Sequence, residues 1–221
     1  MPAILGKKVG MTSVYDDQGR QVPVTVIEAG PCQVLQVKSA EKDGYNAVQL
    51  GFEDKPARKV KKPEAGHAKK ANASPKRFVR EYRTDAVADY AAGATVTLEA
   101  FAEIKHVDVT GVTKGKGVQG PMRRWGFGGQ PGSHGTERKH RSPGGIGEGA
   151  GIPGRGVRLG KHMAGHMGHT VRTVERLKVL KVDTEANLLV VVGSVPGPDG
   201  GYLFVRSAKK MGPEPKKQAS K

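Results

Sequence analysis

Apolar residues recur at every second position in short runs near both ends of the chain, a pattern typical of strands that bury one face. Valine outnumbers leucine 26 to 10, and β-branched residues favour pleated strands over helices. The alternation predicts strands over residues 22–29, 32–38, 45–52, 95–99, 105–110, 174–182, 187–193 and 202–206.

Turn-forming residues separate these strands, with the clearest clusters at 16–19, 30–31, 43–44 and 197–201. Short strands at close spacing predict a mainly β protein with a small closed β-barrel body. Helical periodicity is confined to residues 64–73 and 85–92, so little helix is expected.

Residues 111–172 depart sharply from this pattern. They hold 19 of the 32 glycines and 11 lysines or arginines against two glutamates, but only 8 of the 46 Leu, Ile, Val and Phe residues. Such a segment cannot bury a core of its own. We therefore expect a discontinuous barrel body at 1–110 and 173–208, a long glycine-rich basic extension at 111–172, and a basic flexible tail at 209–221.

The formal charge of +16 predicts a polyanionic partner. Within the extension, cations recur every few residues and alternate with planar side chains such as Trp125, Phe127 and His134, which can stack on bases. Charge and glycine surround Trp125 and cannot form a protein pocket, so we expect its ring to stack on RNA near the tip of the extension, with a core aromatic as the alternative. RNA fits better than duplex DNA because nothing resembles a recognition helix. A second basic run at 55–62 is either a solvated connector or a phosphate contact, and the same alternatives hold for the tail.

Two glycine motifs in the extension match known phosphate or nucleotide loops. Residues 115–120 fit G-x-G-x-x-G, and 117–120 fit the GxxG loop of KH domains. Both loops need a following helix, whereas 121–135 carries seven glycines or prolines, which predict that no helix forms there. We therefore expect neither a dinucleotide site nor a KH domain.

Three histidines, His162, His166 and His169, have spacings that would suit metal ligands on a helix. Gly165 and Gly168 disfavour that helix, so stacking or phosphate contact is the preferred interpretation, with unengaged surface histidines as the alternative. Ser133 and Ser142 lie near histidines but in no nucleophile elbow. No catalysis, cofactor or small-molecule substrate is predicted.

The lone cysteine, Cys32, excludes an internal disulfide and fits a small buried strand residue. No apolar run approaches the roughly 20 residues needed to span a bilayer, and residues 1–10 lack the apolar stretch of a signal peptide. We expect a cytoplasmic protein without a membrane partner.

Several motifs, taken in order along the chain, are familiar. They read LGKKVGMT (5–12), PVTVI (23–27), VDVTG (107–111), KGKG (114–117), RW (124–125), SHG (133–135), HR (140–141), MAGHMG (163–168), NLL (187–189) and VPG (195–197). Together they closely resemble the bacterial ribosomal protein L three family of the large subunit, almost from end to end.

The resemblance implies a β-barrel body and an extension threading into large-subunit rRNA toward the peptidyl transferase centre. It also implies a structural role on the ribosome, with neighbouring ribosomal proteins as further partners and early rRNA binding during assembly. The candidate RNA-binding residues are Lys7, Lys8, Lys114, Lys116, Arg123, Arg124, Trp125, His134, Arg138, Lys139, His140, Arg141, Arg155, Arg158, Lys161, His162 and His166. A basic, non-specific nucleic-acid chaperone is the alternative.

The chain departs from the family pattern at residues 145–154, which contain no glutamine where many bacterial members carry a methylated one. That modification is therefore not expected. This stretch is also about two residues longer than usual, and Glu148 adds a negative charge.

Overall fold

The computed structural model of this chain describes residues 2–16, 18–147 and 157–210. The chain divides into two compact units, Met1–Val112 with Val171–Lys221, and Thr113–Thr170.

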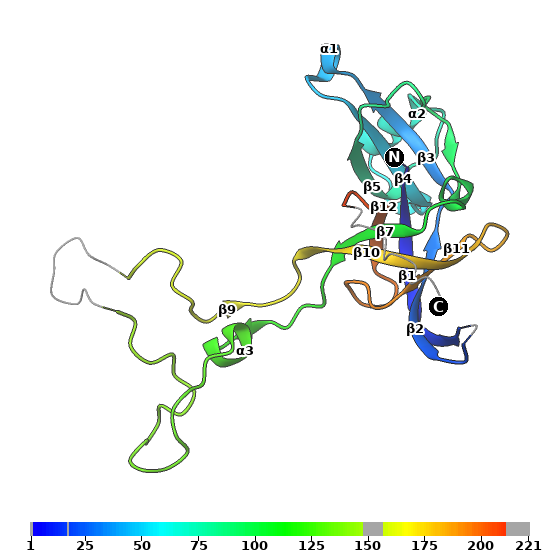
Figure 1. The fold of residues 1–221 in the computed structure, drawn as a ribbon. Helices are drawn as coiled ribbons and strands as arrows, with labels where there is room; N and C mark the ends of the chain where they lie inside the picture. Colours follow the sequence, from blue (N-terminus) through cyan, green and yellow to red (C-terminus); the bar gives the residue numbers. More distant parts are fainter. Residues whose placement is uncertain (1, 17, 148–156, 211–221) are drawn as a thin grey trace. The chain divides into compact units, whose positions relative to one another are not determined.

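The larger unit contains a closed barrel of six strands, each antiparallel to its neighbours, which confirms the predicted fold class (Figure 1). In order around the barrel these are β1 (Ala3–Tyr15), β12 (Tyr202–Ser207), β7 (His106–Val112), β10 (Val171–Asp183), β11 (Leu188–Val192) and β2 (Gln21–Ala29). The two ends of the chain thus meet in one barrel, because β1 pairs with β12 from Ala3 opposite Arg206 to Lys7 opposite Tyr202.

A second sheet of four antiparallel strands belongs to the same unit, whereas the sequence alone did not separate these strands from the barrel. Its order is β5 (Lys76–Arg83), β4 (Ala47–Asp54), β3 (Cys32–Lys38) and β6 (Thr95–Val96). The connections carry helices α1 (Ala40–Asp43) and α2 (Lys62–Lys69) and 3₁₀ turns at Ala57–Lys59 and Leu98–Phe101.

One continuous core joins the two sheets. Ile4, Ile27 and Val205 from the barrel and Val34 and Leu50 from the second sheet are fully or almost fully buried in the same cluster. Alternating apolar positions on short strands are therefore enough to enclose this core from both sheets.

Cys32 lies inside this core, as its apolar surroundings in the sequence predict. Its thiol receives the backbone N–H of Leu5 at 3.3 Å. Burial raises the pKa of the Cys32 thiol to about 12, so the group stays protonated at neutral pH.

Two strands and one helix differ from the sequence-based expectation. The start of the chain was not predicted as a strand because Gly6, Lys7 and Lys8 interrupt the apolar alternation of β1, and β5 was missed because four of its eight residues are Lys or Arg. The helix expected at 85–92 is wrong: this stretch has turns and bends, and Val87 and Tyr90 pack against the core. A helix of eight residues gains too few hydrogen bonds to offset the cost of nucleation, so the packing of Val87 and Tyr90 on the core decides the conformation of this stretch.

Gly6 permits the close approach of β1 and β2. A β-carbon at Gly6 would lie 2.5 Å from the carbonyl oxygen of Glu28, which belongs to a paired strand and cannot move aside. We expect Gly6→Ala to lower the free energy of unfolding by about 1–3 kcal/mol, measured by urea denaturation.

Gly10→Ala is the matched control, since it lies in the same strand but a β-carbon there meets nothing within 4 Å. The free energy of unfolding of Gly10→Ala should not fall by more than about 1 kcal/mol. Equal losses in the two variants would show that Gly6 is not constrained by this contact.

Candidate nucleic-acid interface

The smaller unit, Thr113–Thr170, is here called the ribbon. Its two arms, residues 113–119 and 165–170, run side by side (Figure 1). The backbone N–H of Thr113 donates to the carbonyl of Thr170, that of Lys116 to Met167, and that of Met167 to Gly117, each at 2.9 Å. Further along, β8 (Val118–Gln119) pairs antiparallel with β9 (Gly165–His166). Backbone hydrogen bonds therefore hold together a segment that has almost no apolar side chains to bury.

Gly168 allows this pairing, and Gly165 leaves room for the end of the Arg124 side chain. Gly168 has φ of 76°, and a β-carbon there would overlap the carbonyl oxygen of Lys114 on the opposite arm. A β-carbon at Gly165 would lie 2.5 Å from a guanidinium nitrogen of Arg124. The glycine content of the segment thus serves the contact between its own arms at these points.

A one-turn helix, α3 (Pro121–Trp125), follows β8. The expectation of no helix here was wrong: Pro121 occupies a favourable first position, and Gly126 ends the turn with φ of 76°. A dinucleotide fold nevertheless needs a parallel βαβ unit, whereas β8 and β9 are antiparallel.

Trp125 was expected to find no cover from its own chain, and this expectation was wrong. Its ring stacks on His162 with centroids 3.9 Å apart and an interplanar angle of 2°. Its Nε1–H donates to the carbonyl of Met163 at 2.8 Å, and the Arg124 guanidinium lies over the ring at 4.9 Å. The indole therefore joins the two arms, although 42% of its surface remains exposed.

Arg124 binds the same acceptor as the indole, donating from Nη1 to the carbonyl of Met163 at 2.9 Å. Met163 could not be predicted as an acceptor, because it contributes a backbone atom. These contacts with Met163 and His162 also place Trp125 where the arms are joined, and not near the tip as expected.

Most predicted RNA-binding residues of the extension are exposed, and none of those described makes an ion pair with a described carboxylate. Arg124 is half-buried, and the exposed set comprises Lys114, Lys116, Arg123, Trp125, His134, Arg138, Lys139, His140, Arg141, Arg158, Lys161, His162 and His166. This part of the chain thus presents positive charge that protein carboxylates do not neutralise.

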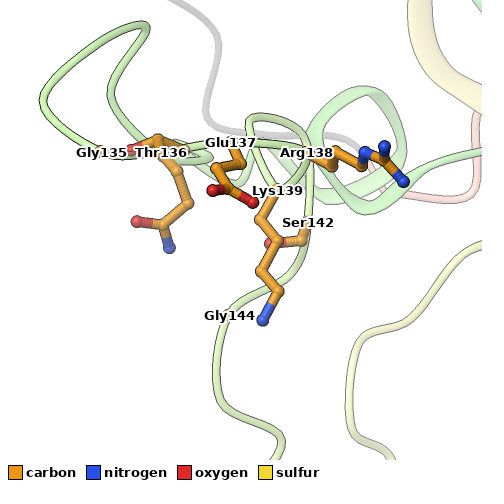
Figure 2. A pocket seen from close by; sticks show the side chains of 8 residues that line it. Gly135, Thr136, Glu137, Arg138, Lys139, Ser142 and Gly144 are labelled. Atoms are coloured by element: carbon orange, nitrogen blue, oxygen red, sulfur yellow. The ribbon is translucent and has the colours of Figure 1, made fainter.

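The loop beyond α3 closes on itself. The backbone N–H of Gln130 donates to the carbonyl of His140 at 2.9 Å, and His140 Nδ1 lies 3.0 Å from the carbonyl oxygen of Pro131. A hollow of about 850 Å³ lies beside residues 135–144, and Figure 2 shows Arg138 and Lys139 leaving the loop in different directions. Its lining residues are polar or charged apart from two glycines, whereas hydrophobic and aromatic side chains line most small-molecule sites.

The three remaining candidates are Lys7, Lys8 and Arg155. Lys8 is buried in the barrel, where its ammonium lies 3.4 Å from both the Gly197 carbonyl and an Asp199 carboxylate oxygen. Lys7 is half-exposed and lies 3.8 Å from Glu53. Arg155 and the departure from the family pattern at 148–154 lie outside the described residues.

The three spaced histidines do not form a helix, because residues 165–166 are in β9. Among the described residues, no group of three or more His, Cys, Asp or Glu side chains could hold a metal ion. No helix in the described part of the chain is long and apolar enough to cross a membrane.

Fold and site together define the class: a basic β-barrel protein with a paired, glycine-rich arm of exposed cations. The family described as Ribosomal protein L3 matches residues 79–203. The chain is 53% identical to the large ribosomal subunit protein uL3 of Corynebacterium jeikeium, over 95% of each chain. It is 53% identical to that of Acidothermus cellulolyticus over 94% of this chain and 92% of the relative.

A third relative, the large ribosomal subunit protein uL3 of Salinispora tropica, is 56% identical over 94% of this chain and 93% of its own length. The chain therefore belongs to the ribosomal protein L3 family, whose members are structural components and not enzymes.

The contacts of Trp125 predict what its removal changes. Trp125→Ala loses the stack on His162 and the hydrogen bond to Met163. We expect the backbone amides of Lys116 and Met167 to exchange with solvent about tenfold faster, a change of about 1.4 kcal/mol. Amide hydrogen exchange of the free protein measures this.

Trp125→Phe is the control that keeps a stacking ring and loses only the N–H donor, so its effect should be smaller. Thermal melting of the barrel should be unchanged in both variants, since every recorded contact of Trp125 lies within 113–170. Unaltered exchange in Trp125→Ala would remove the indole from its assigned role in joining the arms.

Proposed function

We propose that this protein is a structural constituent of the large ribosomal subunit that binds large-subunit rRNA through the extension of residues 111–172. The proposal also includes support of early subunit assembly and of the surroundings of the peptidyl transferase centre. Its partners are large-subunit rRNA and neighbouring ribosomal proteins, and its location is the ribosome.

The observation that carries the proposal is the agreement of relatives over nearly the full chain. Proteins named large ribosomal subunit protein uL3 align with 94–95% of it at 53–56% identity. The exposed cations of the extension that make no ion pair within the described residues supply the chemistry, because such cations can bind phosphates. Family resemblance alone supports the approach to the catalytic centre.

A basic chaperone that binds nucleic acids non-specifically would share the charge but not the stable association. Co-sedimentation separates the two functions: a ribosomal constituent stays with large subunits through a high-salt wash. Loss of the protein from washed subunits would favour the chaperone.

The salt dependence of rRNA binding tests the role of the extension. Arg138, Lys139 and Arg141 are exposed and lack ion-pair partners in the described chain. If all three contact phosphates, replacing them with Gln should reduce the slope of log K against log salt by about 2–3. Filter binding to large-subunit rRNA over a salt series measures the slope.

Unfolding by urea should be unchanged in this triple variant, because the three side chains make no recorded ion pair. An unaltered slope would move the phosphate contacts away from this loop.

A further inference from the structure

The body of the protein has its own concentration of positive charge. Residues 55–83, here called the basic segment, contain eleven lysines and arginines against Glu64 and Glu81, a net charge of +9. The whole body, residues 1–110 and 173–208, carries a net charge of only +3, so the body outside the basic segment has a net charge of −6. All of the body's net positive charge therefore comes from 29 residues.

The basic segment folds around a groove of about 530 Å³ between α2 and β5. Leu35, Ala68 and Phe78 line its apolar part, and Arg77 and Arg80 line it from β5. One end is tied together, since Lys55 donates its backbone N–H to the carbonyl of Pro75 at 2.8 Å.

Nearby carboxylates neutralise only a few of these cations. Glu64 lies 2.6 Å from Lys55, and Asp54 lies 2.7 Å from Lys76. Hydrogen bonds from these lysines lower the pKa of both carboxyl groups, so the carboxylates stay ionised and bound. Within the described residues, no ion pair is recorded for Arg58, Lys59, Lys61, Lys62, Lys69, Lys70, Arg80 or Arg83.

Helical spacing separates two faces of α2. Residues 63, 64, 67 and 68 line the groove, which leaves Lys62, Gly66 and Lys69 on the exposed part of the helix, and exposed Lys70 follows its last residue. Six cations thus surround one short helix and the turn before it, at Arg58, Lys59, Lys61, Lys62, Lys69 and Lys70.

Arg80 is held in place on the other side of the groove. Its guanidinium lies over the Phe78 ring at 4.9 Å and donates from Nη1 to the carbonyl of Val79 at 3.2 Å. A guanidinium fixed in this way keeps other N–H groups for an anion and loses less side-chain freedom on binding.

Protection of an edge strand explains only part of this charge. β5 is the edge of its sheet, and arginines there discourage pairing with another strand. The lysines of α2 and of residues 58–62 lie outside that edge. Their charge complements a polyanion with closely spaced negative groups, as in the phosphate backbone of RNA.

We propose that the exposed cations of residues 58–70, on α2 and just before it, form together with Arg80 at the neighbouring groove a second RNA-binding surface that contacts the phosphate backbone. This inference rests on the proposed rRNA-binding function but uses none of the residues of the extension. Binding there follows backbone geometry, since lysines that contact phosphates carry no direct base readout.

A salt series on the full chain tests the surface. The variant Lys62→Gln, Lys69→Gln, Lys70→Gln removes three exposed cations, and its matched control is Lys42→Gln, Lys178→Gln, Lys181→Gln, three exposed body lysines outside the basic segment. Both variants lose the same net charge. The slope of log K against log salt for large-subunit rRNA should fall by about 2 in the first and by less than about 0.5 in the control.

Equal slopes in the two variants would overturn the second surface. Urea denaturation of both variants confirms that neither substitution unfolds the protein, since glutamine retains good helix propensity.

Thiol protection gives an independent test with only protein and rRNA present. Gly66 is exposed on α2 and a β-carbon there meets nothing within 4 Å, so Gly66→Cys adds an accessible thiol. The native Cys32 is buried and its thiol pKa is raised to about 12, so it should not react with a maleimide at pH 7. Gly10→Cys, also in open space, is the control on the barrel.

We expect rRNA to slow maleimide labelling of Gly66→Cys at least tenfold and that of Gly10→Cys much less. Unchanged labelling of Gly66→Cys in a complex that forms normally would overturn this inference alone. Failure of the unsubstituted protein to bind rRNA would instead overturn the proposed function.

Discussion

Positive charge without protein partners is the constraint on which the rest of this structure depends. The described cations of residues 113–170 make no ion pairs, and their mutual repulsion opposes any compact arrangement. Burial of apolar surface is therefore left to the other unit, where the barrel and the second sheet share one core. The chain separates the residues that stabilise its fold from the residues that we propose bind RNA.

In the ribbon, few side chains are needed to hold the backbone in one conformation. Its arms pair through backbone groups, Gly168 allows them to approach, and Trp125 with His162 joins them where the pairing ends. A ring used in this way keeps only part of its surface for a ligand. An RNA base that stacks on this cluster meets an indole already oriented by Met163 and Arg124, so less conformational freedom is lost on binding.

The sequence predicted the features that depend on composition and alternation. The closed barrel followed from short alternating runs such as 22–29 and 187–193, and the buried Cys32 followed from its apolar neighbours. It missed β1 and β5, where lysines, arginines and glycines occupy strand positions, and it missed the second sheet, because strand pairing is non-local. The role of Met163 could not be predicted, since every residue type carries the backbone carbonyl that accepts these hydrogen bonds.

Two proposed RNA-binding surfaces on one chain have a consequence for the order of binding. The body surface is carried by α2 and β5 and is anchored to a packed core, so it loses little conformational freedom when it meets phosphates. The ribbon lacks such a core, so it loses more conformational entropy than the body does when it binds phosphates. Once the body is bound, contact by the ribbon becomes intramolecular and its effective concentration rises. The physical expectation is that the body binds rRNA first and that the extension becomes ordered on the RNA afterwards.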